Sequence, residues 1–127
     1  MRPEERLIVA LDVDTKEKAI TMVKKLKGDI KIFKIGSELF TSCGPSVVED
    51  VQKAGVKVFL DLKFHDIPNT VIKSAVSATK LGVFMFNVHA SGGIDMMKKA
   101  MEASRDTAKK LKIDPPKVIA VTVPDAY

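Results

Sequence analysis

The sequence predicts an α/β fold built around a parallel sheet. Five short runs rich in β-branched and aromatic residues alternate with longer stretches in which apolar residues recur at helical spacing. A strand followed by a helix and then by another strand is typical of parallel sheets with right-handed crossovers. No linker, low-complexity tract or repeat interrupts this order, so we expect residues 1–127 to form a single α/β unit.

The strands are expected where β-branched and aromatic residues are densest. These runs read RLIVALDV, IKIFKIG, VKVFLDLKF, VFMFNVH and KVIAVTV, at residues 6–13, 30–36, 56–64, 83–89 and 117–123.

Four helices are expected between the strands. In the first, over residues 14–29, the apolar side chains share one face. Asp14 and Glu17 resemble a capping box there, and Gly28 suits the helix end. The other three are expected at about Pro45 to Ala54, Pro68 to Leu81, and about Gly93 to Lys112.

Composition argues against a nucleic-acid-binding, a membrane-spanning and a disulfide-stabilised protein. The formal net charge is +5, but acidic residues separate the lysines along the predicted helices, which indicates solvated helix faces rather than a nucleic-acid surface. No apolar run approaches the ~20 residues of a membrane span, and the start of the chain lacks the pattern of a signal peptide. A single cysteine, Cys43, excludes an internal disulfide. We therefore expect a cytoplasmic protein with neither nucleic-acid nor membrane partners.

The segment FLDLKFHDIPNT, residues 59–70, concentrates charge at the end of a predicted strand. Alternation along that strand would put Asp61 and Lys63 on one face, opposite the apolar residues Leu60 and Leu62. The carboxyl ends of strands are where α/β folds collect their active sites. Asp12, Lys34 and His89 stand near the ends of three other predicted strands. This pattern suits a barrel mouth, and an open doubly wound sheet would place ligands there as well.

Lys34, Asp61, Lys63 and Asp66 would form an array of alternating charge if the second and third strands are neighbours. The alternative is a structural ion-pair network in which Asp66 only starts a helix. A Mg²⁺ or Zn²⁺ site is a further competitor, although lysines among the acids argue against it. The spacing leaves proton transfer, Schiff-base chemistry and decarboxylation open. The candidate metal ligands are Asp12, Asp61, Asp66 and His89.

The segment HASGG, residues 89–93, offers flexible backbone in front of a helix. It is interpreted as a tight turn that requires small residues, with an anion-binding nest as the weaker alternative.

Four segments, in this order, resemble the orotidine 5'-phosphate decarboxylase family. They are LDVD at 11–14, FKIG at 33–36, DLKFHDIPNT at 61–70 and NVHASGG at 87–93. The resemblance implies a TIM-type (β/α)8 barrel, normally a homodimer, that converts orotidine 5'-phosphate to UMP and CO₂ in pyrimidine biosynthesis without cofactor or metal. This chain would supply the N-terminal portion, a partial barrel of about the first five strands and four helices.

The resemblance also implies residue roles. Lys34, Asp61, Lys63 and Asp66 would form the catalytic network, with Lys63 protonating C6 of the pyrimidine and Asp61 near the scissile carboxylate. Asp12 would hydrogen-bond the ribose hydroxyls, and Lys34, close by, would also belong to the substrate-binding residues. Three residues would reach the active site of the partner subunit in trans, namely Asp66, Ile67 and Thr70.

Two departures from the family pattern bear on activity. A complete barrel of ~250 residues would continue for roughly another hundred residues and would include the phosphate-binding loops after strands seven and eight. Ala126 stands where the family has a serine that contacts the pyrimidine. One alternative is therefore a catalytically silent half-barrel that self-associates. Another is a Mg²⁺-dependent enzyme like 3-keto-L-gulonate 6-phosphate decarboxylase, which shares the pattern formed by Asp61, Lys63 and Asp66.

Overall fold

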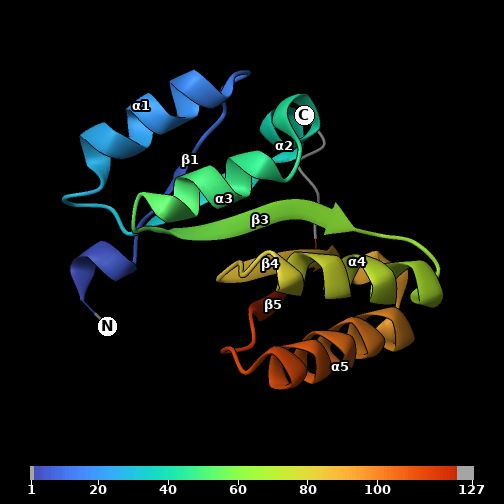
Figure 1. Ribbon diagram of the computed structural model, residues 1–127. Helices are drawn as coiled ribbons and strands as arrows, with labels where there is room; N and C mark the ends of the chain where they lie inside the picture. Colours follow the sequence, from blue (N-terminus) through green and yellow to red (C-terminus); the bar gives the residue numbers. More distant parts are fainter. Residues whose placement is uncertain (1, 123–127) are drawn as a thin grey trace. The chain divides into compact units, whose positions relative to one another are not determined.

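The computed structural model describes residues 2–122 and divides the chain after Asp61 into two compact units (Figure 1). The sheet order is β1-β2-β3-β4-β5, so strands that follow one another in the chain are neighbours in the sheet. Strand β3, Lys57–Phe64, begins in the first unit and ends in the second. The parallel α/β class predicted from the alternating pattern is confirmed, while the prediction of a single domain remains a prediction.

The first unit contains β1 (Ile8–Ala10), β2 (Ile32–Gly36) and most of β3. β1 pairs with β2 and β2 pairs with β3, both in parallel. Its helices are the short η1 (Pro3–Glu5), α1 (Lys16–Leu26), α2 (Ser37–Cys43) and α3 (Ser46–Lys53). The buried core combines strand residues such as Phe33 and Ile35 with helix residues such as Val23 and Val51. This packing holds the carboxyl end of β2 beside β3, with Gly36 in register with Asp61.

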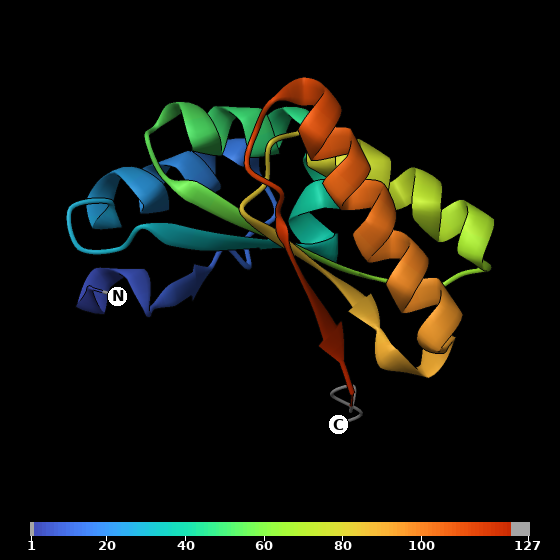
Figure 2. The same cartoon turned by 90° about the horizontal axis from the view of Figure 1, so that it is seen from below.

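Helices α1 and α3 lie next to each other in both ribbon views and are joined by an ion pair (Figures 1 and 2). Lys16 Nζ lies 2.9 Å from Asp50 Oδ2. The hydrogen bond from the Lys16 ammonium holds the pKa of the Asp50 carboxyl below its ordinary value of 3.8. A carboxyl whose pKa is depressed by folding stabilises the fold above its unfolded pKa and loses that contribution as pH falls through its folded pKa.

Replacing Lys16 with methionine is therefore expected to lower the urea midpoint slightly at pH 7. The difference from the wild type should begin to shrink near the ordinary pKa of 3.8 and vanish once the pH is below the lowered pKa of Asp50 in the folded wild type, because Asp50 is then protonated in both proteins. Added salt should shrink it too, since both side chains are partly exposed. Urea unfolding at pH 7 and pH 3 measures this, and a midpoint difference that stays the same at both pH values would contradict it.

The second unit contains the end of β3, α4 (Pro68–Lys80), β4 (Met85–His89), η2 (Ala90–Gly92), α5 (Ile94–Leu111) and β5 (Lys117–Val121). β4 and β5 pair in parallel, and α4 packs along α5 (Figure 2). Small buried residues, including Ala75 and Ala100, line this unit's helices. The hydroxyl of Thr79 donates to Ala75 O at 2.7 Å and lies 3.1 Å from Ser104 Oγ. These contacts allow the two helices to approach closely.

The structure corrects the predicted helices in two places. Helix α2 was not expected, and it brings the number of α-helices in residues 2–122 to five rather than four. Its seven residues are too few for a helical period to stand out, and it follows β2 without a break. The cap of α1 is Thr15, whose side chain accepts from Lys18 N at 3.2 Å. Asp14 instead pairs with the Lys18 ammonium at 2.9 Å, so the proposed Asp14–Glu17 capping box was wrong.

The remaining helices agree with the prediction to within a few residues. α4 begins at Pro68, where the missing N–H of proline costs the helix nothing. α5 ends at Leu111, and the next residue, Lys112, has a φ of +57°, the left-handed conformation that commonly closes helices. The Ile113 N–H then bonds to Ala108 O at 3.0 Å. None of the helices within residues 2–122 has both the length and the apolar composition needed to cross a membrane.

Candidate active site

In the first unit, Lys34 and Asp61 form an ion pair where β2 and β3 run side by side. Asp61 is in register with Gly36 and Lys34 with Phe59, so the Lys34 ammonium reaches toward the carboxyl end of β2, with Nζ 3.5 Å from Asp61 Oδ2. The Asp61 side chain is 10% exposed and that of Lys34 29% exposed. Burial of a carboxylate is unfavourable without a partner charge, and Lys34 supplies that charge. The predicted adjacency of these two residues is confirmed.

Asp12 follows β1 and is exposed. The strand is shorter than predicted and ends at Ala10, but the backbone stays beside β2 because Leu11 N donates to Lys34 O at 2.8 Å. Leu11 is fully buried, which anchors the chain immediately before Asp12. The carboxylate of Asp12 is thus carried by a segment tied to the backbone of Lys34.

In the second unit, Lys63 has an exposed side chain and a backbone φ of +49°. The prediction that Lys63 shares a face with Asp61 depended on extended backbone, in which successive side chains alternate. A left-handed residue interrupts that alternation. Strand parity therefore does not determine where the Lys63 side chain points.

Asn87 contacts Lys63 and was missed by the sequence reasoning. It lies in β4, is 2% exposed, and its Oδ1 accepts a hydrogen bond from Lys63 N at 2.9 Å. The sequence contains one signal that could have identified it, an amide side chain inside the apolar run VFMFNVH. A buried amide in such a run requires hydrogen-bond partners.

Asp66, Ile67 and Thr70 lie together where α4 begins. Asp66 Oδ1 accepts from Ile67 N at 2.7 Å, and Thr70 N donates to Ile67 O at 3.0 Å. Asp66 thus bonds to Ile67, the residue just before α4, but the helix has no side-chain cap, so the alternative that Asp66 only starts the helix stays open. All three residues are exposed, and the Ile67 side chain is exposed to 65%.

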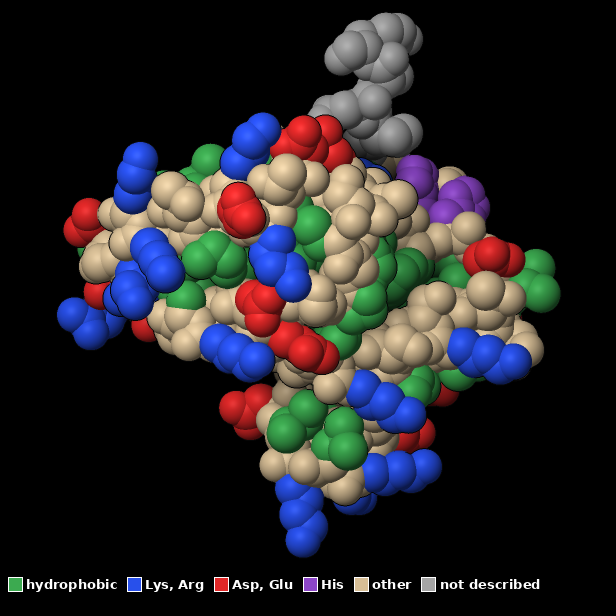
Figure 3. Space-filling model, turned by 45° about the horizontal axis from the view of Figure 1, so that its top comes forward, with side chains coloured by type: hydrophobic (Ala, Val, Ile, Leu, Met, Phe, Trp, Pro, Cys, Tyr) green, Lys and Arg blue, Asp and Glu red, His purple; other side chains and the backbone are tan. Residues whose placement is uncertain are grey.

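The two histidines stack on each other beside the turn after β4. The rings of His65 and His89 are 5.0 Å apart between centroids and form a single patch on the surface (Figure 3). His89 Nδ1 accepts from Ser91 N at 3.2 Å, which closes the 3₁₀ turn η2. A Cβ at Gly92 would collide with the sulfur of buried Met96. Gly93 has a φ of +98°, which favours glycine, so the structure supports the interpretation of HASGG as a tight turn that requires small residues, and the anion-binding nest stays an alternative.

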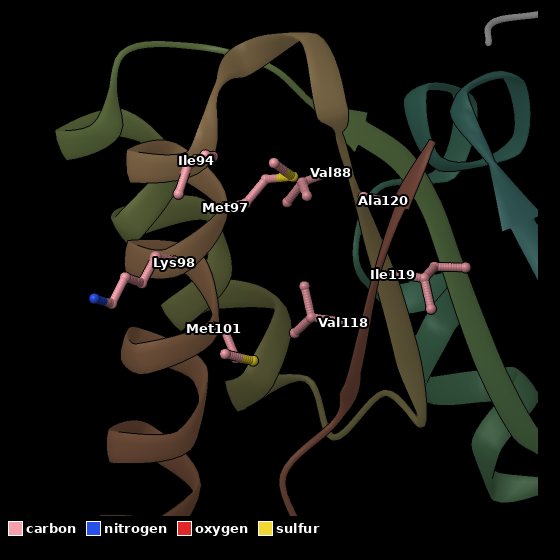
Figure 4. Close-up of a pocket in the computed structure, with 8 residues that line it drawn as sticks. All are labelled: Val88, Ile94, Met97, Lys98, Met101, Val118, Ile119 and Ala120. Atoms are coloured by element: carbon pink, nitrogen blue, oxygen red, sulfur yellow. The ribbon is translucent and has the colours of Figure 1, made fainter. Parts of the chain in front are cut away.

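A separate apolar groove of about 460 Å³ runs along α5 and β5 (Figure 4). It has one charged lining residue, Lys98, and none of the predicted site residues. Apart from Lys98, its lining residues are apolar. The lining residues are Val88, Ile94, Met97, Lys98, Met101, Val118, Ile119 and Ala120.

The candidate ligands of the competing metal-site interpretation are not assembled in the described part of the chain. Among residues 2–122, no three His, Cys, Asp or Glu side chains are grouped so that they could hold a metal ion. The departure at Ala126 lies outside the described residues.

The chain is similar to known proteins over nearly its whole length. The family model described as "Orotidine 5'-phosphate decarboxylase / HUMPS family" matches residues 5–124. A protein of Syntrophomonas wolfei subsp. wolfei named orotidine 5'-phosphate decarboxylase is 51% identical over 123 residues, which are 97% of this chain and 52% of that protein. One of the same name from Saccharophagus degradans is 53% identical over 121 residues, 95% of this chain and 49% of that protein.

Solved structures agree with these matches. The crystal structure of orotidine 5'-phosphate decarboxylase from Lactobacillus acidophilus superposes with a TM-score of 0.86 at 39% identity, covering 96% of this chain and 55% of that one. An uncharacterized conserved protein from Geobacillus kaustophilus also gives a TM-score of 0.86, at 38% identity, over 94% of this chain and 55% of that one. The chain thus spans about half the length of the proteins that it matches.

Proposed function

Because the chain belongs to the orotidine 5'-phosphate decarboxylase / HUMPS family, we propose that it carries the catalytic charges of an orotidine 5'-phosphate decarboxylase. The proposed substrate is the nucleotide orotidine 5'-phosphate, and the products are UMP and CO₂, as in pyrimidine biosynthesis. One observation carries the proposal. The Lys34–Asp61 ion pair joins charged residues from two of the segments that resemble the family, at a separation of 3.5 Å.

In the proposed reaction, Lys63 is the proton donor. The bond between C6 of the pyrimidine and its carboxylate breaks, the electron pair remains on C6, and CO₂ leaves. The Lys63 ammonium then gives its proton to C6, forming a C–H bond and leaving a neutral amine. The exposed side chain of Lys63 is accessible to a ligand, and a positive charge beside C6 stabilises the developing carbanion. No cofactor or metal takes part in this scheme.

Asp61 and Lys34 act as a pair in this proposal. The Lys34 ammonium lies 3.5 Å from a carboxylate oxygen of Asp61 and supplies the opposite charge for it. A second carboxylate, that of the substrate, would be repelled by Asp61, and this repulsion would ease as CO₂ departs. Asp12, held next to the backbone of Lys34, would accept hydrogen bonds from the ribose hydroxyls.

We further propose a cytoplasmic homodimer in which Asp66, Ile67 and Thr70 serve the partner's site. A large apolar side chain exposed to 65%, as at Ile67, suits a surface that is covered on association. The neighbouring exposed carboxylate of Asp66 would bring the fourth charge of the network to the partner subunit. The unpaired cysteine Cys43 suits a reducing compartment.

The test is a product assay on the purified chain. The chain is incubated with orotidine 5'-phosphate in the presence of a metal chelator, and UMP is measured by chromatography. A parallel sample receives the separately produced second half of the Syntrophomonas wolfei relative, because this chain spans 52% of that protein. We expect UMP to form at least in the complemented sample, without added metal.

Two results would contradict the proposal. One is the absence of UMP from both samples while the intact relative is active, which would favour the silent half-barrel. The other is conversion of 3-keto-L-gulonate 6-phosphate only when Mg²⁺ is supplied, which would favour the sugar-acid enzyme. Light scattering on the same samples tests the homodimer.

A further inference from the structure

Lys63 adopts a backbone conformation that its neighbourhood in the chain does not explain. Among residues 2–122, two residues other than glycine have positive φ, Lys63 at +49° and Lys112 at +57°. Lys112 closes helix α5, where the left-handed conformation is common. Lys63 lies instead inside β3, where the backbone is normally extended. For a long side chain this conformation is unfavourable and requires a specific contact to hold it.

The side chain of Asn87 makes such a contact. The Lys63 N–H donates to Asn87 Oδ1 at 2.9 Å, although the two residues are 24 positions apart. Asn87 is 2% exposed and stands between Phe86 and Val88, which are 0% and 1% exposed. The strand is therefore buried on both faces at this point, and the amide is enclosed in the core. Its oxygen, rather than its nitrogen, must face Lys63, because the backbone N–H is a donor.

We propose that Asn87 is a positioning residue that holds the Lys63 backbone in its left-handed conformation and so aims the ammonium group. This inference rests on the proposed function, because it concerns the lysine that would donate the proton. The direction of the Cα–Cβ bond depends on φ and ψ, so a return to extended backbone would swing the whole side chain. Proton transfer needs the donor within hydrogen-bond reach of its acceptor, and a displacement of ~1 Å can cost ~10²-fold in rate.

The burial of Asn87 supports a role of this kind. A leucine at this position has nearly the same size and suits an apolar environment, while a buried amide is tolerated only with hydrogen-bond partners. The bond that Asn87 accepts comes from the backbone of Lys63, so its effect on Lys63 does not depend on the lysine side chain. Asn87 can therefore be tested in the presence and in the absence of the ammonium group.

The first measurement is nuclear magnetic resonance on the purified 127-residue chain labelled at lysine. A residue with positive φ has its amide and α protons unusually close, which gives an intense cross-peak within the residue. We expect this signal for Lys63 in the wild type and in Asn87→Asp, which keeps an acceptor oxygen. It should weaken in Asn87→Leu, or in Asn87→Ala if the leucine variant does not fold.

A matched control is Thr79→Val. Thr79 is also fully buried and hydrogen-bonded in the second unit, but its contacts are with Ala75 and Ser104. Its replacement should lower the melting temperature and leave the Lys63 signal intact. An unchanged Lys63 signal in the folded leucine or alanine variant would overturn the proposal. So would a loss of that signal in the control as well.

The second measurement uses the active sample of the product assay. Asn87→Leu is expected to lower kcat by about 10- to 100-fold with little change in KM, and Asn87→Asp to restore most of the rate. In a Lys63→Ala background the leucine substitution should have no further effect, since it acts through Lys63. A change in KM alone, or equal losses in both backgrounds, would overturn the proposal. An inactive wild type would contradict the proposed function, while the magnetic resonance comparison would still decide whether Asn87 holds Lys63.

Discussion

Replacement of Lys63 with alanine is expected to reduce kcat for UMP formation by at least about 10²- to 10⁴-fold, the usual contribution of a positioned general acid. The proposed reaction leaves an electron pair on C6 of the pyrimidine. Lys63→Ala removes both the proton donor and the positive charge that Lys63 would place beside the carbanion. Both losses act on the transition state, so the change should appear mainly in kcat rather than in KM.

Lys63→Arg separates the two contributions. The guanidinium retains a positive charge but does not release its proton under ordinary conditions. We expect kcat to remain low in Lys63→Arg, while binding of the product UMP, measured by titration calorimetry, is better preserved than in Lys63→Ala.

Circular dichroism and the melting temperature provide the control for both variants. Lys63 is exposed, so neither substitution should unfold the protein. A Lys63→Ala variant that keeps the wild-type kcat would exclude Lys63 as the proton donor. A Lys63→Arg variant with full activity would show that charge alone is sufficient.

Replacement of Phe86 with alanine is expected to have the largest effect on stability, lowering the free energy of unfolding by about 3–5 kcal/mol. Phe86 is fully buried in β4, and its ring lies 5.8 Å from that of Phe64, tilted by 53°. The substitution removes apolar surface from the core and leaves a cavity. Domains of this size are stable by only about 5–15 kcal/mol, so the loss would be a large fraction of the total.

Urea unfolding measures this loss, and Ile94→Ala is the matched comparison. Ile94 is also a large apolar residue of the second unit, but it is 80% exposed, so its truncation should change stability by no more than roughly 0.5 kcal/mol. Phe86→Leu should be intermediate, because it keeps most of the apolar volume. If Phe86→Ala were no more destabilising than Ile94→Ala, the core assigned to the second unit would be wrong.

Much of the architecture could be predicted because hydrophobic periodicity is a local property of the chain. The run VKVFLDLKF became β3, and the helical pattern after Pro68 became α4. Helix α2 was not predicted because its seven residues make too few turns for a helical period to be visible in the sequence. The N-cap of α1 was also predicted wrongly. Asp14 and Thr15 both suit an N-cap position, and only the backbone geometry shows that Thr15 occupies it.

The same distinction between local and tertiary information applies to the candidate site. Residue types and their order were sufficient to identify the family and to select Lys34, Asp61, Lys63 and Asp66 as the charged residues of interest. The pairing of Lys34 with Asp61 depended on the predicted adjacency of two strands, and the structure contains it.

The sequence by itself therefore determined the α/β class, most of the helices and strands, and the charged residues of the candidate site. Hydrophobic periodicity and residue type are local properties that can be read from the sequence. Only the tertiary structure decided that Lys63 turns left-handed and that Asn87, 24 residues away, accepts its N–H. The φ angle of a single residue produces no recurring pattern of apolar and polar residues, so the sequence does not reveal it. A bond between a side chain and a distant backbone group exists only after the strands have been brought together.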